Sequence, residues 1–149
     1  MPQPARASSF PFHHPIQVSL RDLDALGHVN HAVYLSYLEV ARTNYYFGLR
    51  GFREIADLDF ILGSVSCRYR SPAFLHETLI VSLGPSQIGR KSWDLRYEIH
   101  ESATGRLVAE ASTTQVHYDY REGKAVEIPA GLRERLERDR PDEAGPPVR

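Results

Sequence analysis

Apolar and polar residues alternate along this chain with two different periods. Residues 16–21 alternate with a period of two, which predicts a half-buried strand. From Asn30, a favourable N-cap, to about Phe47 the period becomes that of an α-helix with a wide apolar face. So wide a face must be covered on most sides. Gly48 or Gly51 is the expected stop, since glycine accepts the left-handed conformation at a helix end.

Beyond a linker through Asp59 the period of two returns in four segments. They are residues 63–69, 79–83, 93–99 and 106–118. The later segments are joined by short connections, so they should pair antiparallel. A short helix is predicted at 132–136. We therefore predict an α+β domain, with a curved antiparallel sheet of about five strands wrapped around one long helix.

The two ends of the chain differ in composition from the middle. Residues 1–15 hold four of the ten prolines, and 139–149 are charged and proline-rich. We expect a flexible segment at 1–14, a folded domain at 15–138 and a disordered tail at 139–149.

Composition excludes several classes of protein. The formal net charge of −1 argues against a nucleic-acid binder that relies on bulk charge. Cys67 is the only cysteine, so no intramolecular disulfide can form. No apolar run reaches the roughly 18 residues that span a membrane, and the first residues lack a signal peptide's apolar stretch. We expect a cytoplasmic protein without membrane contact.

The chemistry-bearing residues gather just before the long helix. Asp22 and Asp24 lie in a loop that reaches Asn30 and His31 through Gly27. The first N–H groups of a helix lack intrahelical partners and can stabilise an oxyanion. A carboxylate beside them could activate water or attack a carbonyl. From spacing alone, helix capping is the commoner role for such aspartates.

Two further groups carry weaker signals. His28 and His31 could suggest a metal, but zinc needs three or four ligands and the other histidines show no ligand spacing, so none is expected. Arg90 and Lys91 follow Gly89 in a turn and could hold phosphates, or form an ordinary solvated turn. Walker A, Gly-x-Gly-x-x-Gly and Gly-x-Ser-x-Gly motifs are all absent from the sequence.

Three motifs together carry a family resemblance over roughly residues 15–137. The loop reads Asp-x-Asp-x-x-Gly-x-Val before a tyrosine-bearing helix that contains Glu39-Val40-Ala41-Arg42. It resembles the hotdog-fold acyl-CoA thioesterases of the 4-hydroxybenzoyl-CoA thioesterase-like branch, which includes YbgC-type and FadM-type enzymes. Residues 68–73 and 89–92 are similar to that family's strand-to-turn segment and its next turn.

The resemblance implies the roles of particular residues. The family's catalytic carboxylate falls on Asp24, and the histidine of YbgC-type members falls on His31. Asn30 follows the FadM type. Asp22 is expected to stabilise the loop only. The substrate-binding residues expected are Gly27, Asn30, Ala32, Val33, Tyr34, Arg90 and Lys91, with the N–H groups near 31–33 as oxyanion site. No cofactor is expected.

The resulting expectation is hydrolysis of an acyl-CoA to free acid and CoA. Asp24 would be general base or nucleophile; the sequence does not choose between these roles, nor does it give the acyl group. The alternatives are a non-catalytic acyl-CoA or acyl-carrier-protein binding module and an enoyl-CoA hydratase. The family also implies a homo-oligomer, a dimer or a tetramer built as a dimer of dimers, with sites at the subunit junction and CoA-phosphate contacts often supplied by the neighbouring subunit.

Overall fold

The computed structural model describes residues 9–141 and 148. The strands are β1 (Phe12–Gln17), β2 (Phe60–Tyr69), β3 (Thr78–Ile88), β4 (Ser92–Glu101), β5 (Leu107–Asp119) and β6 (Lys124–Ala125). The helices are α1 (Val33–Arg50) and α2 (Ala130–Asp139), with single 3-10 turns η2 (Leu20–Asp22) and η3 (Ile55–Asp57). None of the helices in the described part of the chain is long and apolar enough to cross a membrane.

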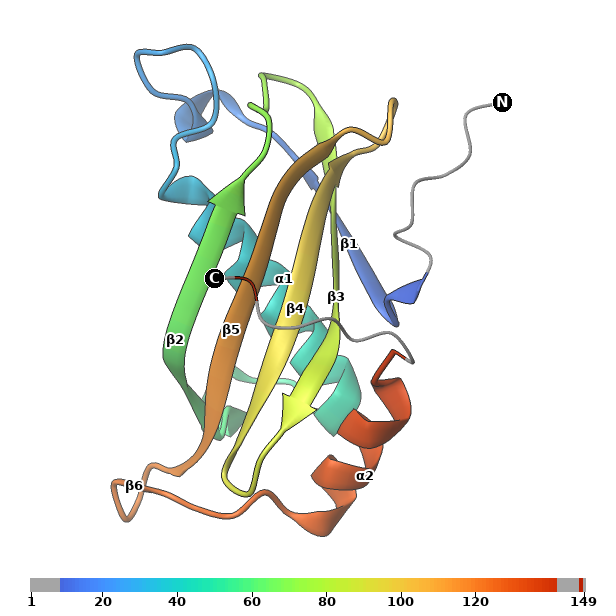
Figure 1. The fold of residues 1–149 in the computed structure, drawn as a ribbon. Coiled ribbons are helices and arrows are strands. Elements are labelled where there is room, and N and C mark those ends of the chain that lie inside the picture. Colours follow the sequence, from blue (N-terminus) through green and yellow to red (C-terminus); the bar gives the residue numbers. More distant parts are fainter. Residues whose placement is uncertain (1–8, 142–147, 149) are drawn as a thin grey trace.

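The five longer strands form one antiparallel sheet in the order β1-β3-β4-β5-β2, and β6 pairs with the end of β5. The sheet curls around α1, which runs along its concave face, and α2 lies beside the C-terminal end of α1 (Figure 1). This architecture confirms the predicted fold class, a curved sheet around one long helix.

The core lies between α1 and the concave face of the sheet. The strict alternation predicted for 93–99 is confirmed, because Trp93, Leu95, Tyr97 and Ile99 are each at most 1% exposed. On α1 most of the predicted apolar positions are buried as well, but Val40 is 44% exposed. Tyr46, predicted for the more polar stripe, is buried and stacks on Trp93 with 5.7 Å between ring centroids. Burying each such side chain contributes about 1.5–3 kcal/mol.

The first strand differs from its prediction. It runs from Phe12 to Gln17, earlier than the predicted 16–21, and includes residues 12–14 of the segment expected to be flexible. Proline suggested disorder there, but β1 is an edge strand, where the missing N–H of Pro15 is tolerated. Residues 1–8, 142–147 and 149, the rest of the two terminal predictions, lie outside the described residues.

The long helix also has shifted ends. It begins at Val33, not at Asn30, and continues to Arg50, beyond the predicted Phe47. Gly51 takes the left-handed conformation with φ 67° and its N–H donates to the Phe47 carbonyl, so the second of the two expected stops is the one used.

One side of the molecule is poorly covered. Strand β2 is the other edge of the sheet and is half-buried or exposed along its whole length, whereas β3, β4 and β5 are largely buried. The large apolar side chains exposed along β2 are Ile61, Leu62, Val65 and Tyr69, and Leu35 and Val40 are exposed on α1. This α1–β2 side presents both an unpaired strand edge and apolar surface.

Candidate functional site

The first aspartate of the loop, Asp22, is bonded within the loop framework. The Ser19 N–H and the Tyr37 hydroxyl donate to its Oδ2 at 3.0 and 2.7 Å, and its carbonyl accepts from the Asn30 N–H. Partial burial acts to raise the pKa of Asp22, but these hydrogen bonds outweigh it and the pKa is lowered. Asp22 thereby joins the start of the loop to its end.

The second aspartate, Asp24, lines a pocket. The Leu26 N–H donates to Oδ1 at 2.9 Å and the Asn30 Nδ2 donates to Oδ2 at 3.1 Å. Gly27, with φ 85°, closes the turn by donating its N–H to the Asp24 carbonyl. Each carboxylate oxygen keeps a further lone pair for a substrate or water.

Asn30 accepts hydrogen bonds from two of the three N–H groups expected to form the oxyanion site. Its Oδ1 accepts from the Ala32 N–H at 2.9 Å, and its carbonyl accepts from the Val33 N–H at 3.0 Å. The His31 N–H donates no hydrogen bond to the described part of the chain. Of the three groups, that of His31 is therefore the one available to a ligand.

The pocket has a volume of about 380 Å³ and lies between the loop and the end of β2. Its lining residues are Asp24, Leu26, His28, Val29, His31, Tyr34, Tyr69, Arg70, Ser71 and Pro72. Three of the expected site residues, Asp24, His31 and Tyr34, thus meet in one cavity. The other expected residues of this segment, Gly27, Asn30, Ala32 and Val33, do not line the pocket.

The pocket wall opposite the loop is formed by residues 69–72, for which the sequence predicted no role in the site. There the Tyr69 hydroxyl donates to the His31 carbonyl at 2.7 Å, and the Tyr69 and Tyr34 rings form an edge-to-face pair with 5.1 Å between their centroids. Arg70 is paired with Glu110 at 2.8 Å. The only hint in the sequence was the likeness of 68–73 to the family's strand-to-turn segment.

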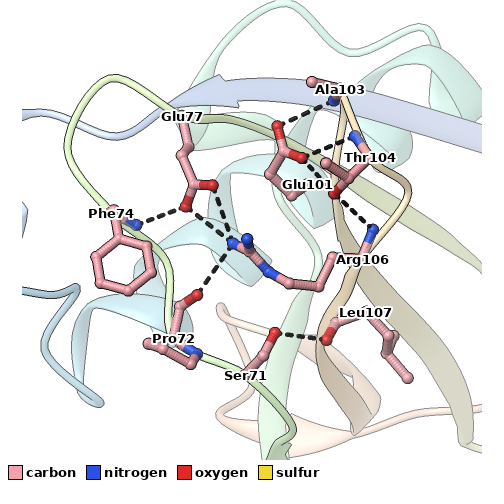
Figure 2. Close-up of polar contacts among 9 residues, drawn as sticks. All are labelled: Ser71, Pro72, Phe74, Glu77, Glu101, Ala103, Thr104, Arg106 and Leu107. Carbon is pink, nitrogen blue, oxygen red and sulfur yellow. Dashed lines mark hydrogen bonds and ion pairs between the residues drawn. The ribbon is translucent and has the colours of Figure 1, made fainter.

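An ion-pair cluster fixes this wall from behind (Figure 2). The Arg106 Nη2 donates to both carboxylate oxygens of Glu77, at 2.9 and 3.0 Å, and to the Pro72 carbonyl at 3.1 Å. The Ala73 carbonyl accepts from the Val29 N–H at 2.9 Å, which links the wall to the loop. The two sides of the pocket are therefore joined through backbone and ion-pair contacts.

Arg90 and Lys91 do not join this pocket. They lie in the β3–β4 turn, at the end of the molecule opposite the loop that precedes α1 (Figure 1). The Arg90 Nε donates to Glu127 at 2.7 Å, and both side chains are largely exposed. Within one chain, these cations cannot contact a ligand bound at Asp24.

The described residues offer no cluster of three or more His, Cys, Asp or Glu side chains that could hold a metal ion. His28, one of the two candidate ligands, instead has its Nδ1 3.4 Å from the Val29 carbonyl.

Comparison with known proteins places the chain in a family. Residues 18–136 match the Thioesterase-like superfamily. The chain belongs to this superfamily. Among the superfamily's members, the long-chain acyl-CoA thioesterase FadM of Escherichia coli is 33% identical over 124 residues, covering 82% of this chain and 94% of that protein.

Two solved structures share the architecture of this thioesterase-like chain. A thioesterase from Thermus thermophilus, complexed with coenzyme A and Zn, has a TM-score of 0.77 and 29% identity, covering 85% of this chain and 98% of that one. A 1,4-dihydroxy-2-naphthoyl-CoA thioesterase from Synechocystis has a TM-score of 0.75 and 24% identity, covering 91% and 98%. The second likeness concerns the fold alone.

Proposed function

We propose that this protein hydrolyses acyl-CoA thioesters in the pocket between the Asp24 loop and the end of β2. The observation that carries the proposal is a half-buried carboxylate, Asp24, sharing a cavity with His31 at the start of α1. Membership of the superfamily and the likeness to FadM support the class of reaction.

In the proposed reaction the thioester carbonyl oxygen accepts a hydrogen bond from the His31 N–H. This donor lies at the positive end of α1, where negative charge developing on the oxygen is stabilised. The Ala32 and Val33 N–H groups, which were also expected to donate, take no part, because Asn30 already accepts from both. The His31 side chain, which lines the pocket, orients the carbonyl or the water.

Asp24 supplies the catalytic carboxylate. As general base it removes a proton from water while the water oxygen attacks the carbonyl carbon. As nucleophile it attacks that carbon itself, and water then hydrolyses the resulting anhydride. In both routes the C–S bond breaks and CoA leaves as a thiolate. Because an ordinary thiol has a pKa of roughly 8.5, the leaving group needs little protonation and a catalytic triad is unnecessary.

The exposed α1–β2 side suggests how a second subunit completes the site. If two copies pair antiparallel along their β2 edges, the two-fold axis reverses one copy relative to the other. The β3–β4 turn of one copy then approaches the loop end of its partner. Arg90 and Lys91 would in this way reach the phosphates of a CoA whose thioester lies at the partner's Asp24.

Replacing Asp24 with Asn tests the proposal. The amide cannot act as base or nucleophile, so thiol release from acyl-CoA substrates should fall by about 10²–10⁴-fold. The thermal melting temperature should fall only slightly, because an amide oxygen can still accept from the Leu26 N–H and only the hydrogen bond from the Asn30 Nδ2 is lost.

Asp94→Asn is the matched control, a half-buried aspartate that accepts from Thr114 Oγ1 on β5 and lies away from the pocket. Near-normal turnover by Asp24→Asn would refute the assignment. Loss of enoyl absorbance without thiol release by the unmodified protein would indicate a hydratase, and binding without either reaction would indicate a binding module.

A further inference from the structure

A hydrogen bond from the Tyr69 hydroxyl joins the sheet to the start of α1. Tyr69 is the last residue of β2, where it pairs with Ala109 of β5. Its hydroxyl donates to the His31 carbonyl at 2.7 Å, and both residues line the Asp24 pocket. Partial burial raises the pKa of the Tyr69 phenol, so the group keeps its proton and remains a donor. The sheet is therefore bonded directly to the residue that carries the available N–H group.

The ring of Tyr69 is held in place by aromatic packing. Tyr34, which is 3% exposed, forms the edge-to-face pair with Tyr69. Tyr34 forms a second such pair with Tyr37, with 5.9 Å between the ring centroids, and the Tyr37 hydroxyl donates to Asp22. The position from which the Tyr69 hydroxyl donates is thus set by buried side chains of α1.

Two peptide groups flank the Cα atom of His31. The first contains the His31 N–H and the Asn30 carbonyl, which accepts from the Val33 N–H at 3.0 Å. The second contains the His31 carbonyl, which accepts from Tyr69. It also contains the Ala32 N–H, which donates to Asn30 Oδ1 at 2.9 Å. Three of these four polar groups are bonded, whereas the His31 N–H makes no hydrogen bond to the described part of the chain.

These three hydrogen bonds restrain the His31 backbone in different ways. The two bonds to Asn30 lie within the segment that starts α1, so they fix its local shape. The bond from Tyr69 comes from the sheet and fixes the place of that segment relative to the opposite wall of the pocket. A donor must be oriented before charge develops on an oxyanion, and a misplacement of about 1 Å can lower a rate about 100-fold.

We propose that Tyr69 is a positioning residue, whose hydroxyl holds the His31 backbone so that the His31 N–H points at the thioester carbonyl oxygen. The inference rests on the proposed thioesterase function and adds to it a residue that acts through His31. Because the bond joins two segments of the same chain, this role does not depend on how two copies pair.

Removing only the hydroxyl group tests the role of Tyr69. Tyr69→Phe keeps the ring and its contact with Tyr34, and kcat for a given acyl-CoA should fall about tenfold. KM should stay within about twofold, because kcat and kcat/KM fall together when the lost interaction acts only in the transition state. The thermal melting temperature should change little, since a single partly exposed hydrogen bond is lost.

Two unreactive analogues of the same acyl-CoA give a second measurement. A trifluoromethyl ketone analogue adds water and presents a tetrahedral carbon with an oxygen where the oxyanion develops, whereas a thioether analogue has no carbonyl oxygen. Only the first can accept from the His31 N–H. Tyr69→Phe should therefore weaken binding of the ketone about tenfold and leave binding of the thioether unchanged.

Tyr120→Phe is the matched control. Tyr120 is also an exposed tyrosine, its hydroxyl donates to the Phe60 carbonyl at 2.8 Å, and its ring forms an edge-to-face pair with Tyr118 at 5.0 Å. It does not line the Asp24 pocket, so this variant should leave kcat and both affinities unchanged.

The possible results separate this inference from the proposed function. An unchanged kcat in Tyr69→Phe would overturn the inference alone. A raised KM with an unchanged kcat, or equal weakening of both analogues, would also overturn it, because Tyr69 would then bind the substrate itself. Failure of the unmodified protein to hydrolyse any acyl-CoA would overturn the proposed function and this inference together.

Discussion

Asn30 shows how much of the site depends on one side chain. It was expected as the helix N-cap, and it contacts the Asp24 carboxylate as well as the Ala32 and Val33 N–H groups. The sequence identified the residue but not the first of these contacts, because Asn30 lies six positions after Asp24. Only the loop closure at Gly27 brings the two side chains together, and hydropathy periods carry no information about loop closure.

The other aspartate supports a prediction about pH. Because hydrogen bonds from Ser19 and Tyr37 lower the folded-state pKa of Asp22 below its ordinary 3.8, the carboxylate stabilises the fold above that value. This stabilisation is lost as the pH falls through the lower folded-state value. Asp22→Asn should therefore melt below the unmodified protein at pH 6, and the difference should shrink as the pH approaches 3.

The melting temperatures of both proteins, measured by circular dichroism between pH 3 and pH 6, check this. A difference that stays constant across the range would show that the Asp22 charge contributes nothing. Tyr37→Phe, which removes one donor, should show part of the same pH dependence.

At the scale of elements, periodicity predicted each long strand and both helices but misplaced β1. Pro15 by itself predicts the end of a strand, which is why β1 was misplaced. A strand can contain this proline because β1 is at the edge of the sheet, and the sequence does not show that position. The Arg106–Glu77 cluster was invisible for a similar reason. Glu77 lies just before β3 and Arg106 just before β5, and which strands lie near each other is a long-range property that local spacing does not reveal.

That cluster leads to a prediction about the pocket wall. Arg106→Met removes the donor that ties Glu77 to the Pro72 carbonyl, so the segment carrying Ser71 and Pro72 should loosen. We expect kcat to fall about tenfold through misplacement of the wall, with an unfolding free energy lower by about 1 kcal/mol. Steady-state kinetics and chemical denaturation measure the two effects.

Arg106→Lys should recover part of the kcat, because a lysine keeps the charge but not the fixed planar fork. Arg138→Met, which breaks an exposed ion pair on α2, is the control and should change neither quantity measurably. A loss of stability without any loss of kcat would restrict Arg106 to a purely structural role.

At the scale of the whole molecule, the predicted fold is confirmed, while the placement of the expected site residues is only partly as anticipated. Asp24, His31 and Tyr34 meet in one pocket, because they are close together in the sequence. Arg90 and Lys91 lie at the far end of the sheet, because a β-hairpin places its turn a full strand length from its open end (Figure 1). Sequence spacing alone gives no such distance.

The remote cations yield a prediction for CoA binding. Replacing both Arg90 and Lys91 with Ala should raise KM for acyl-CoA by about tenfold, since charge-assisted phosphate contacts are lost. KM for the matching acyl-pantetheine, which has no phosphate, should not change. Lys124→Ala, which removes an exposed cation on β6, is the control. Equal changes in KM for the two substrates would show that Arg90 and Lys91 do not bind the CoA phosphates.

The Asp24 loop and the cationic turn lie at opposite ends of one chain, which has a consequence for mixtures of two variant proteins. In the proposed pair, each site takes its carboxylate from one copy and its phosphate-binding cations from the other. A copy with Asp24→Asn and a copy without Arg90 and Lys91 are each impaired by themselves. When they assemble together, one of the two sites regains an intact carboxylate and intact cations, while the other site loses both. Subunit exchange between two impaired preparations should therefore generate activity that neither has alone.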